Sequence, residues 1–135
     1  GEWDKNIFLY FEEILFCSKG TRKKFFSYQI NEIKAETKGT TVVIRDEIER
    51  EKWQGLLRWH FIWSKFYVSK KRYGYFISLL IFTPIIVRIL SRLSFYSLTN
   101  ERKKYKKYRL RLSGLYNSII GNKSFLRIER VNEYN

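Results

Sequence analysis

Residues 53–67 read Trp-Gln-Gly-Leu-Leu-Arg-Trp-His-Phe-Ile-Trp-Ser-Lys-Phe-Tyr, and this stretch decides most of the fold. Its apolar and aromatic positions recur every three or four residues, which is the spacing of one face of an α-helix. The helical pattern begins at Asp46 and leads into the basic run Lys70-Lys71-Arg72. We therefore predict a long aromatic helix that ends among positive charges.

Two further helical segments follow downstream. Residues 73–87 carry no charge and include Pro84 near their far end, but fifteen residues are fewer than the roughly 18–20 that span a bilayer. We therefore expect a buried or interfacial helix there. A last helix is expected at about residues 100–120, with Tyr105, Tyr108 and Leu115 on an apolar stripe. Its opposite face is basic and consists of Arg102, Lys103, Lys104, Lys106, Lys107, Arg109 and Arg111.

Upstream of the long helix the pattern is mixed. Residues 12–19 predict a short helix that stops at Gly20. Residues 25–30 and 32–37 predict two strands, and in the second Ile33 and Ala35 alternate with charged residues. Two strands do not make a stable sheet alone, so we expect partner strands from sequence upstream of residue 1. The expected fold class is α/β, in which a short helix and two strands precede a mainly α-helical basic extension.

Composition narrows the possible partners. The 135 residues include 27 Lys and Arg against 13 Asp and Glu, which gives a formal net charge of +14. Such a charge favours an anionic partner, such as nucleic acid, an anionic membrane or a phosphorylated ligand. One Cys and one His exclude a disulfide framework and a zinc site built from these two residue types. We interpret Cys17 as a small core residue, and His60 as a packed or partly exposed ring rather than a catalytic base.

Residues 8–17, Phe-Leu-Tyr-Phe-Glu-Glu-Ile-Leu-Phe-Cys, follow Gly1-Glu2-Trp3-Asp4. This block resembles the "G-x-F-D-E" and "F-L-Y-F-E-E-x-D-L-C" motifs in the middle of family 2 glycosyltransferases. Residues 60–67 and 70–75 look like the C-terminal extension of bacterial members, and residues 107–115 and 121–125 are similar to its closing segment. The resemblance implies the C-terminal fragment of a longer enzyme with a GT-A-like (Rossmann-like) fold. Residues 1–45 would end its catalytic domain, and residues 46–135 would form a membrane-proximal helical extension.

The resemblance also implies a chemistry. It makes the chain part of an inverting transferase of envelope polysaccharide synthesis, which moves a sugar from a nucleotide-sugar donor to a saccharide or lipid-linked acceptor. By position Glu13 would be the general base, with Glu12 beside it. The alternative is that both glutamates only complement a helix dipole. A divalent cation, Mg²⁺ or Mn²⁺, is expected in the complete enzyme, and its ligands would lie upstream rather than in this chain.

The loop after the second expected strand departs from the family pattern. The family's His falls on Thr37, and its acid two places after the Glu pair is Leu15. Since a hydroxyl is a weak ligand for a divalent cation, Thr37 is a poor replacement for that His. Gly39, Thr40 and Thr41 keep the small, hydroxylated end of the loop, and we expect them with Thr37 to contact the donor's phosphates.

The basic helices suggest where such an enzyme would work. Trp59, Trp63, Phe66 and Tyr67 precede the basic run, as in helices anchored at lipid headgroups, although they could equally be core. We favour a cytoplasmic protein that is peripheral to the inner membrane and binds its anionic leaflet through the basic residues. The alternative is a small basic module that binds anionic membrane or nucleic acid without catalysis. Nucleic acid is the weaker partner, because Tyr and Lys/Arg fall on opposite faces of the last helix.

Overall fold

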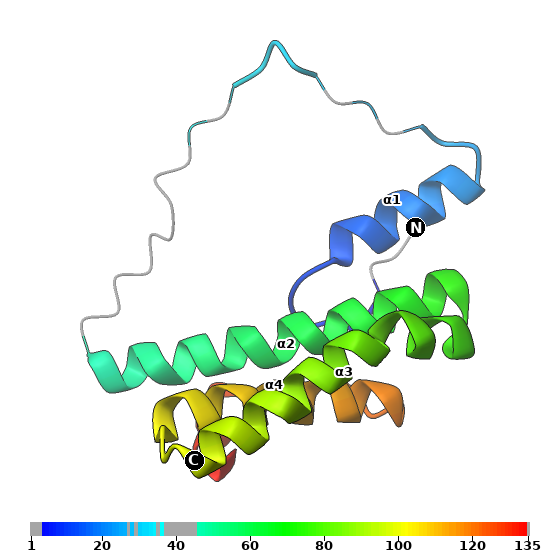
Figure 1. Cartoon of the computed structure of the whole chain (residues 1–135). Coiled ribbons are helices and arrows are strands. Elements are labelled where there is room, and N and C mark those ends of the chain that lie inside the picture. The colour runs from blue at the N-terminus through cyan, green and yellow to red at the C-terminus, as the bar shows by residue number, and fades with distance from the viewer. Residues whose placement is uncertain (1–3, 27, 29, 35, 37–45, 135) are drawn as a thin grey trace.

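The computed structural model describes residues 4–26, 28, 30–34, 36 and 46–134 of the chain. Within these residues the elements follow in the order α1 (Glu12–Arg22), α2 (Glu47–Tyr73), α3 (Tyr75–Leu98), α4 (Arg102–Ile119) and a 3₁₀-helix, η1 (Ile128–Tyr134). Helices α2, α3 and α4 pack against one another, and η1 packs on α2 and α4. In Figure 1, α1 lies on the opposite side of α2 from α3 and α4.

The α/β expectation is wrong for the part of the chain that the structure describes, because it contains no strand. The described residues of the two expected strands are exposed, including Phe26, Tyr28 and Ile33. Alternating side chains favour a strand only when a neighbouring chain pairs with its backbone N–H and C=O groups. No described segment lies in position to do so, and the pattern alone does not create the ladder.

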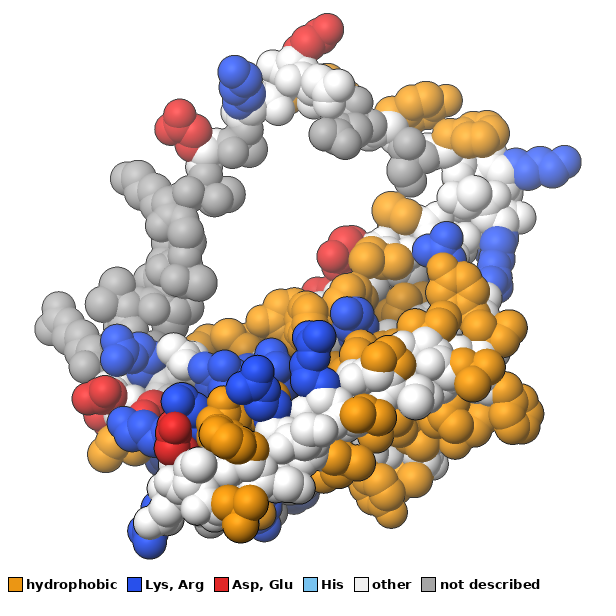
Figure 2. Space-filling view, viewed as in Figure 1, with side chains coloured by type: hydrophobic (Ala, Val, Ile, Leu, Met, Phe, Trp, Pro, Cys, Tyr) orange, Lys and Arg blue, Asp and Glu red, His pale blue; other side chains and the backbone are white. Residues whose placement is uncertain are grey.

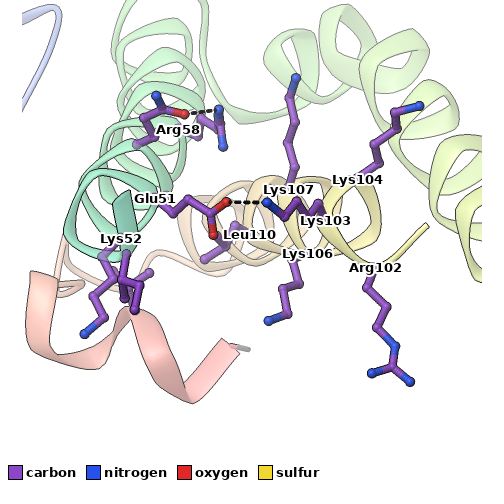
Figure 3. Close-up of a pocket in the computed structure, with 13 residues that line it drawn as sticks. Glu51, Lys52, Arg58, Arg102, Lys103, Lys104, Lys106, Lys107 and Leu110 are labelled. Atoms are coloured by element: carbon purple, nitrogen blue, oxygen red, sulfur yellow. Dashed lines mark hydrogen bonds and ion pairs between the residues drawn. The ribbon is translucent and has the colours of Figure 1, made fainter. Parts of the chain in front are cut away.

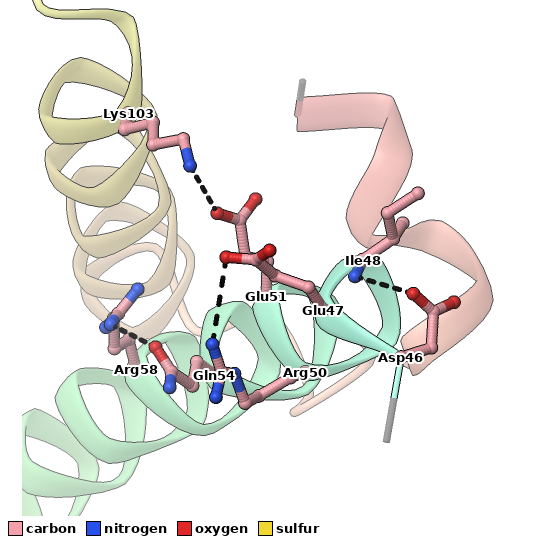
Figure 4. A network of polar contacts seen from close by, with 8 residues as sticks. All are labelled: Asp46, Glu47, Ile48, Arg50, Glu51, Gln54, Arg58 and Lys103. Atoms are coloured by element: carbon pink, nitrogen blue, oxygen red, sulfur yellow. Dashed lines mark hydrogen bonds and ion pairs between the residues drawn. The ribbon is translucent and has the colours of Figure 1, made fainter. Parts of the chain in front are cut away.

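The long central helix matches the prediction closely. Asp46 is its N-cap, and the Asp46 carboxylate accepts a hydrogen bond from the backbone N–H of Ile48 at 3.0 Å (Figure 4). The helix ends at Gly74, whose φ of 85° is a conformation that other residues rarely adopt. Gly74 is also the residue from which α3 starts, so this one glycine turns the chain between two helices.

The core is built around the aromatic residues of α2. Trp59, Trp63 and Phe66 are completely or almost completely buried, and Tyr67 is buried too. The interpretation of these four as lipid-facing anchors is therefore wrong. These four side chains pack against the N-terminal segment, α3, α4 and the C-terminal segment, so they have no lipid-accessible face.

The other helices extend or correct the sequence-based expectations. Helix α1 continues through Gly20 to Arg22, and Cys17 is exposed on it rather than part of the core. Helix α4 covers the expected range to within two residues at its start. Helix α3 runs for 24 residues, from Tyr75 to Leu98. Neither Pro84 nor Arg88, the first charged residue after the apolar run, ends it.

Candidate functional site

The two glutamates singled out by the sequence lie in the first turn of α1. The backbone just before them is unusual: Tyr10 and Phe11 have φ values of 69° and 65°. Residues other than glycine adopt this left-handed conformation at a cost of order 1–3 kcal/mol, and they keep it only where their surroundings impose it. The chain therefore turns sharply into α1 at a fixed point, directly before Glu12 and Glu13.

Side chains of α2 hold this turn. The hydroxyl of Ser64 donates a hydrogen bond to the carbonyl oxygen of Leu9 at 2.7 Å. The rings of Tyr10 and Phe11 both contact Phe61, at centroid distances of 5.5 and 5.3 Å. Polar and aromatic contacts from one stretch of α2 thus fix the residues that enter α1.

A second anchor lies a few residues earlier. The hydroxyl of Tyr67 donates to Oδ2 of Asp4 at 3.0 Å, and Nδ2 of Asn6 donates to both Oδ1 of Asp4 and the Tyr67 oxygen. Burial, together with Asp4, raises the pKa of Tyr67 to about 12. Burial alone would raise the pKa of Asp4, but the hydrogen bonds from Asn6 and Tyr67 and the charge of Lys71 lower it. This tyrosine–aspartate contact ties the start of the described chain to α2.

The two glutamates differ in their surroundings. Oε2 of Glu12 is buried and has no hydrogen-bond partner among the described residues, whereas Glu13 is exposed. Of the pair, Glu13 is the carboxylate that a substrate could approach from solution.

The remaining residues expected at the donor site, Thr37, Gly39, Thr40 and Thr41, lie outside the described residues. In the described part of the chain, no group of three or more His, Cys, Asp or Glu side chains gathers where it could hold a metal ion. We therefore assign no metal ligand to these residues.

The sequence-predicted basic residues fall into two places. At the end of α2, the ammonium group of Lys70 reaches the carbonyl oxygen of Ser118, Lys71 lies over the Tyr67 ring and Arg72 lies over the Tyr73 ring. Five of the seven basic residues of α4 line a cleft of about 400 Å³ between α2 and α4 (Figure 3), namely Arg102, Lys103, Lys104, Lys106 and Lys107. Arg109 and Arg111 lie outside it, and the Arg111 guanidinium sits over the Tyr108 ring.

Two basic residues of this cleft were not predicted from the sequence. Lys52 and Arg58 of α2 also line it, so α2 adds positive charge opposite α4. The sequence did contain a signal for these two residues. Lys52 and Arg58 lie on the polar face of the predicted long helix, and a helix with an apolar face is expected to pack beside another one. What the sequence could not show is that the partner helix is the other strongly basic one.

His60 is a structural residue, as predicted. It is completely buried, and its Nε2 donates to the carbonyl oxygen of Leu126 at 2.9 Å, so Nδ1 is left to accept from the Ser124 hydroxyl at 2.8 Å. Burial is the main cause that lowers the pKa of His60 to about 4, and the nearby charge of Arg127 acts in the same direction. Because the ring is completely buried and both of its nitrogens are hydrogen-bonded within the protein, neither nitrogen is open to a substrate.

No protein-family profile matches the chain, and no curated protein or solved structure does. What the protein does is therefore inferred from its own residues.

One more surface bears on function. Helix α3 buries one face against α2 and α4, through Ser78, Phe82 and Ile89, and leaves the other open. Eight large apolar side chains are exposed on α3, together with Arg88 and Arg92; the apolar ones are Phe76, Ile77, Leu80, Ile81, Val87, Leu90, Phe95 and Leu98. Of the helices in the described ranges, α3 is the one that is long and apolar enough to cross a membrane. Figure 2 shows these hydrophobic side chains beside a row of Lys and Arg side chains.

Proposed function

We propose that the chain is the C-terminal part of an inverting glycosyltransferase of the family 2 type, in which Glu13 is the general base. The observation that carries this proposal is the fixed left-handed turn at Tyr10 and Phe11, which delivers an exposed Glu13 at the start of α1. Backbone strain of this kind gathers at active sites, where it positions reactive groups. The match of residues 8–17 to the family's acid-pair block supports the same assignment.

The chemistry required of Glu13 is simple. A sugar hydroxyl is a poor nucleophile, and a carboxylate within hydrogen-bond distance accepts its proton as the hydroxyl oxygen bonds to the donor's anomeric carbon. The bond from that carbon to the nucleotide's phosphate oxygen breaks, and the nucleotide leaves with the electron pair. Glu12 and Glu13 both lie in the first turn of α1, at the positive end of its helix dipole.

The other components of such an enzyme would come from upstream sequence. The nucleotide-sugar donor and a divalent cation, Mg²⁺ or Mn²⁺, would bind there, and the cation would neutralise charge on the leaving diphosphate. Residues 1–45 would then complete the catalytic domain, with Thr37, Gly39, Thr40 and Thr41 close to the donor.

We further propose that the enzyme is cytoplasmic and rests on the inner face of the membrane through α3. The helix packs on α4, which carries seven Lys and Arg residues, so a crossing α3 would draw these charges toward hydrocarbon. Each would cost roughly 2.5–3.5 kcal/mol at the centre of a bilayer. A helix lying in the plane of the interface avoids that cost and still buries its apolar face.

The test of the catalytic proposal uses the complete protein encoded by the gene and a panel of nucleotide sugars. We expect sugar transfer by the wild type and a loss of about 10²–10⁴ in kcat for Glu13→Gln, with donor binding unchanged. Glu32→Gln, at an exposed glutamate outside the helices, is the matched control and should retain full activity. An inert wild type, or a Glu13→Gln variant as active as the control, would favour the non-catalytic binding module instead.

A further inference from the structure

The cleft between α2 and α4 has a large excess of positive charge. Seven Lys and Arg side chains line it, and Glu51 is the only carboxylate residue among its lining residues. Glu51 pairs with Lys103 at 3.2 Å, and Lys104 pairs with Glu101 at 2.6 Å. Lys52, Arg102, Lys106 and Lys107 form no ion pair with any residue that the structure describes. An uncompensated cluster of this kind repels itself and so opposes folding unless an anion binds there.

Arg58 adds to this excess from the α2 side. Its guanidinium donates to the neutral amide oxygen of Gln54 at 2.7 Å, and it forms no ion pair with a described carboxylate (Figures 3 and 4). Partial burial, and next the charge of Arg111, lower the pKa of Arg58. A half-buried guanidinium that faces other cations is suited to a bidentate contact with a phosphate.

The start of α4 points to the same ligand. Its first turn contains Arg102, Lys103 and Lys104 and no acidic residue, which is opposite to the preference set by the helix dipole. The Glu101 side chain makes no capping hydrogen bond there. The side chains of this first turn, Arg102, Lys103 and Lys104, all line the cleft and add positive charge to it.

The position of the cleft identifies the carrier of that anion. Three residues separate the end of α3 from the start of α4, and the last exposed apolar residues of α3 are Phe95 and Leu98. In Figure 2 the row of Lys and Arg side chains borders the hydrophobic side chains. If α3 lies at a membrane surface, the cleft is at the depth of the lipid headgroups.

Nucleic acid fits this cleft less well. Single strands are bound by cations together with aromatic rings on which the bases stack. The nearby rings of Tyr96 and Tyr108 are engaged with each other at 5.6 Å, and Lys104 and Arg111 lie over them. Phosphates would therefore find partners, while bases would not.

We propose that the α2–α4 cleft binds a terminal phosphate or diphosphate group of a membrane lipid. Such a group concentrates about two negative charges or more in one place, whereas an ordinary phosphodiester headgroup carries one. The concentrated charge matches a cleft in which most cations lack a partner. The inference rests on the membrane placement of α3 proposed above and is independent of the transfer reaction.

The experiment measures binding of the full chain to vesicles. One set contains phosphatidic acid, whose phosphate is terminal, and the other contains phosphatidylglycerol at matched surface charge. We expect the wild type to prefer phosphatidic acid at least about tenfold, the gain of one or two charge-assisted hydrogen bonds. Arg58→Gln/Lys107→Gln should reduce that preference to less than about twofold. Lys65→Gln/Lys123→Gln removes two exposed charges outside the cleft and should keep the full preference.

Further arms separate the possible sources of the phosphate. Inorganic diphosphate should compete for the cleft and lower the preference, yet bind the free chain more weakly than the vesicles do. Binding of soluble diphosphate or single-stranded RNA as tightly as phosphatidic acid vesicles would overturn the assignment to a lipid. Equal binding to both vesicle types would overturn the site itself, while leaving the Glu13→Gln result unaffected. Should Arg58→Gln unfold the chain, Lys52→Gln/Lys106→Gln tests the same cleft.

Discussion

Gly114 determines how closely α4 approaches α2. A Cβ atom at this position would lie 2.7 Å from the carbonyl oxygen of Trp59 and 2.8 Å from Cγ2 of Ile62. We therefore expect Gly114→Ala to lower the free energy of unfolding by about 1–3 kcal/mol, because the helices must move apart. Gly20, in α1, is the matched control: its Cβ would meet nothing closer than 3.9 Å. Gly20→Ala should raise the free energy of unfolding by up to about 1 kcal/mol. Urea unfolding of both variants checks the signs, and equal effects would refute the close approach.

His60 makes stability depend on pH in a defined window. Its pKa is about 4 in the folded protein and about 6.5 when unfolded, so between these values the unfolded state binds more protons. The contribution of the neutral His60 to the free energy of unfolding is therefore fully present above about pH 6.5. Up to about 3 kcal/mol of it is lost as the pH falls toward 4. His60→Gln should lower the free energy of unfolding at every pH. Because glutamine does not titrate, this pH dependence should disappear in the variant. Urea unfolding at several pH values tests it, and parallel curves for wild type and variant would contradict the neutral, buried ring.

At the scale of the element, α3 exposes large apolar side chains that the rest of the described chain does not cover. Leu80 is 73% exposed, so Leu80→Asp should change the free energy of unfolding by no more than about 0.5 kcal/mol. The same change should weaken binding to phosphatidylglycerol vesicles at least about tenfold, since a charge then enters the interface. Asn31→Asp, at an exposed turn position, changes the charge equally and should have little effect. Vesicle co-sedimentation measures the binding of both variants. An equal loss of binding in Leu80→Asp and Asn31→Asp would mean that net charge alone drives binding, and would contradict a role for α3.

The helices were predicted correctly from the sequence, whereas the two predicted strands are absent from the described residues. Both outcomes have one physical reason. A helix satisfies its own hydrogen bonds, so the spacing of residues 53–67 suffices to predict α2. A strand requires a partner whose position no local pattern encodes. The orientation of each helix was equally hidden: the same aromatic spacing suits a lipid-facing and a core-facing stripe, and only the structure identified Trp59 and Trp63 as core.

At the scale of the whole molecule, the net charge of +14 predicted an anionic partner but not its place. The cleft needs Lys52 and Arg58 from α2 together with the first turns of α4, and these lie some fifty residues apart in sequence. The acid pair was proposed from its local block alone, because its residues are adjacent, and it stays a prediction. The turn that positions it was not predictable, since Ser64 and Phe61 reach it from α2.

The packing of α2 also gives the protein an optical signature. The rings of Trp59 and Trp63 lie nearly parallel, 12° apart at 6.5 Å, and Tyr67 continues the row at 4.9 Å from Trp63. Rings held this rigidly in an asymmetric environment give a strong near-ultraviolet circular dichroism band, which fades when fixed packing is lost even if the helices persist. Without any attached label, that band would report whether α2 and α4 stay together when the protein meets a membrane.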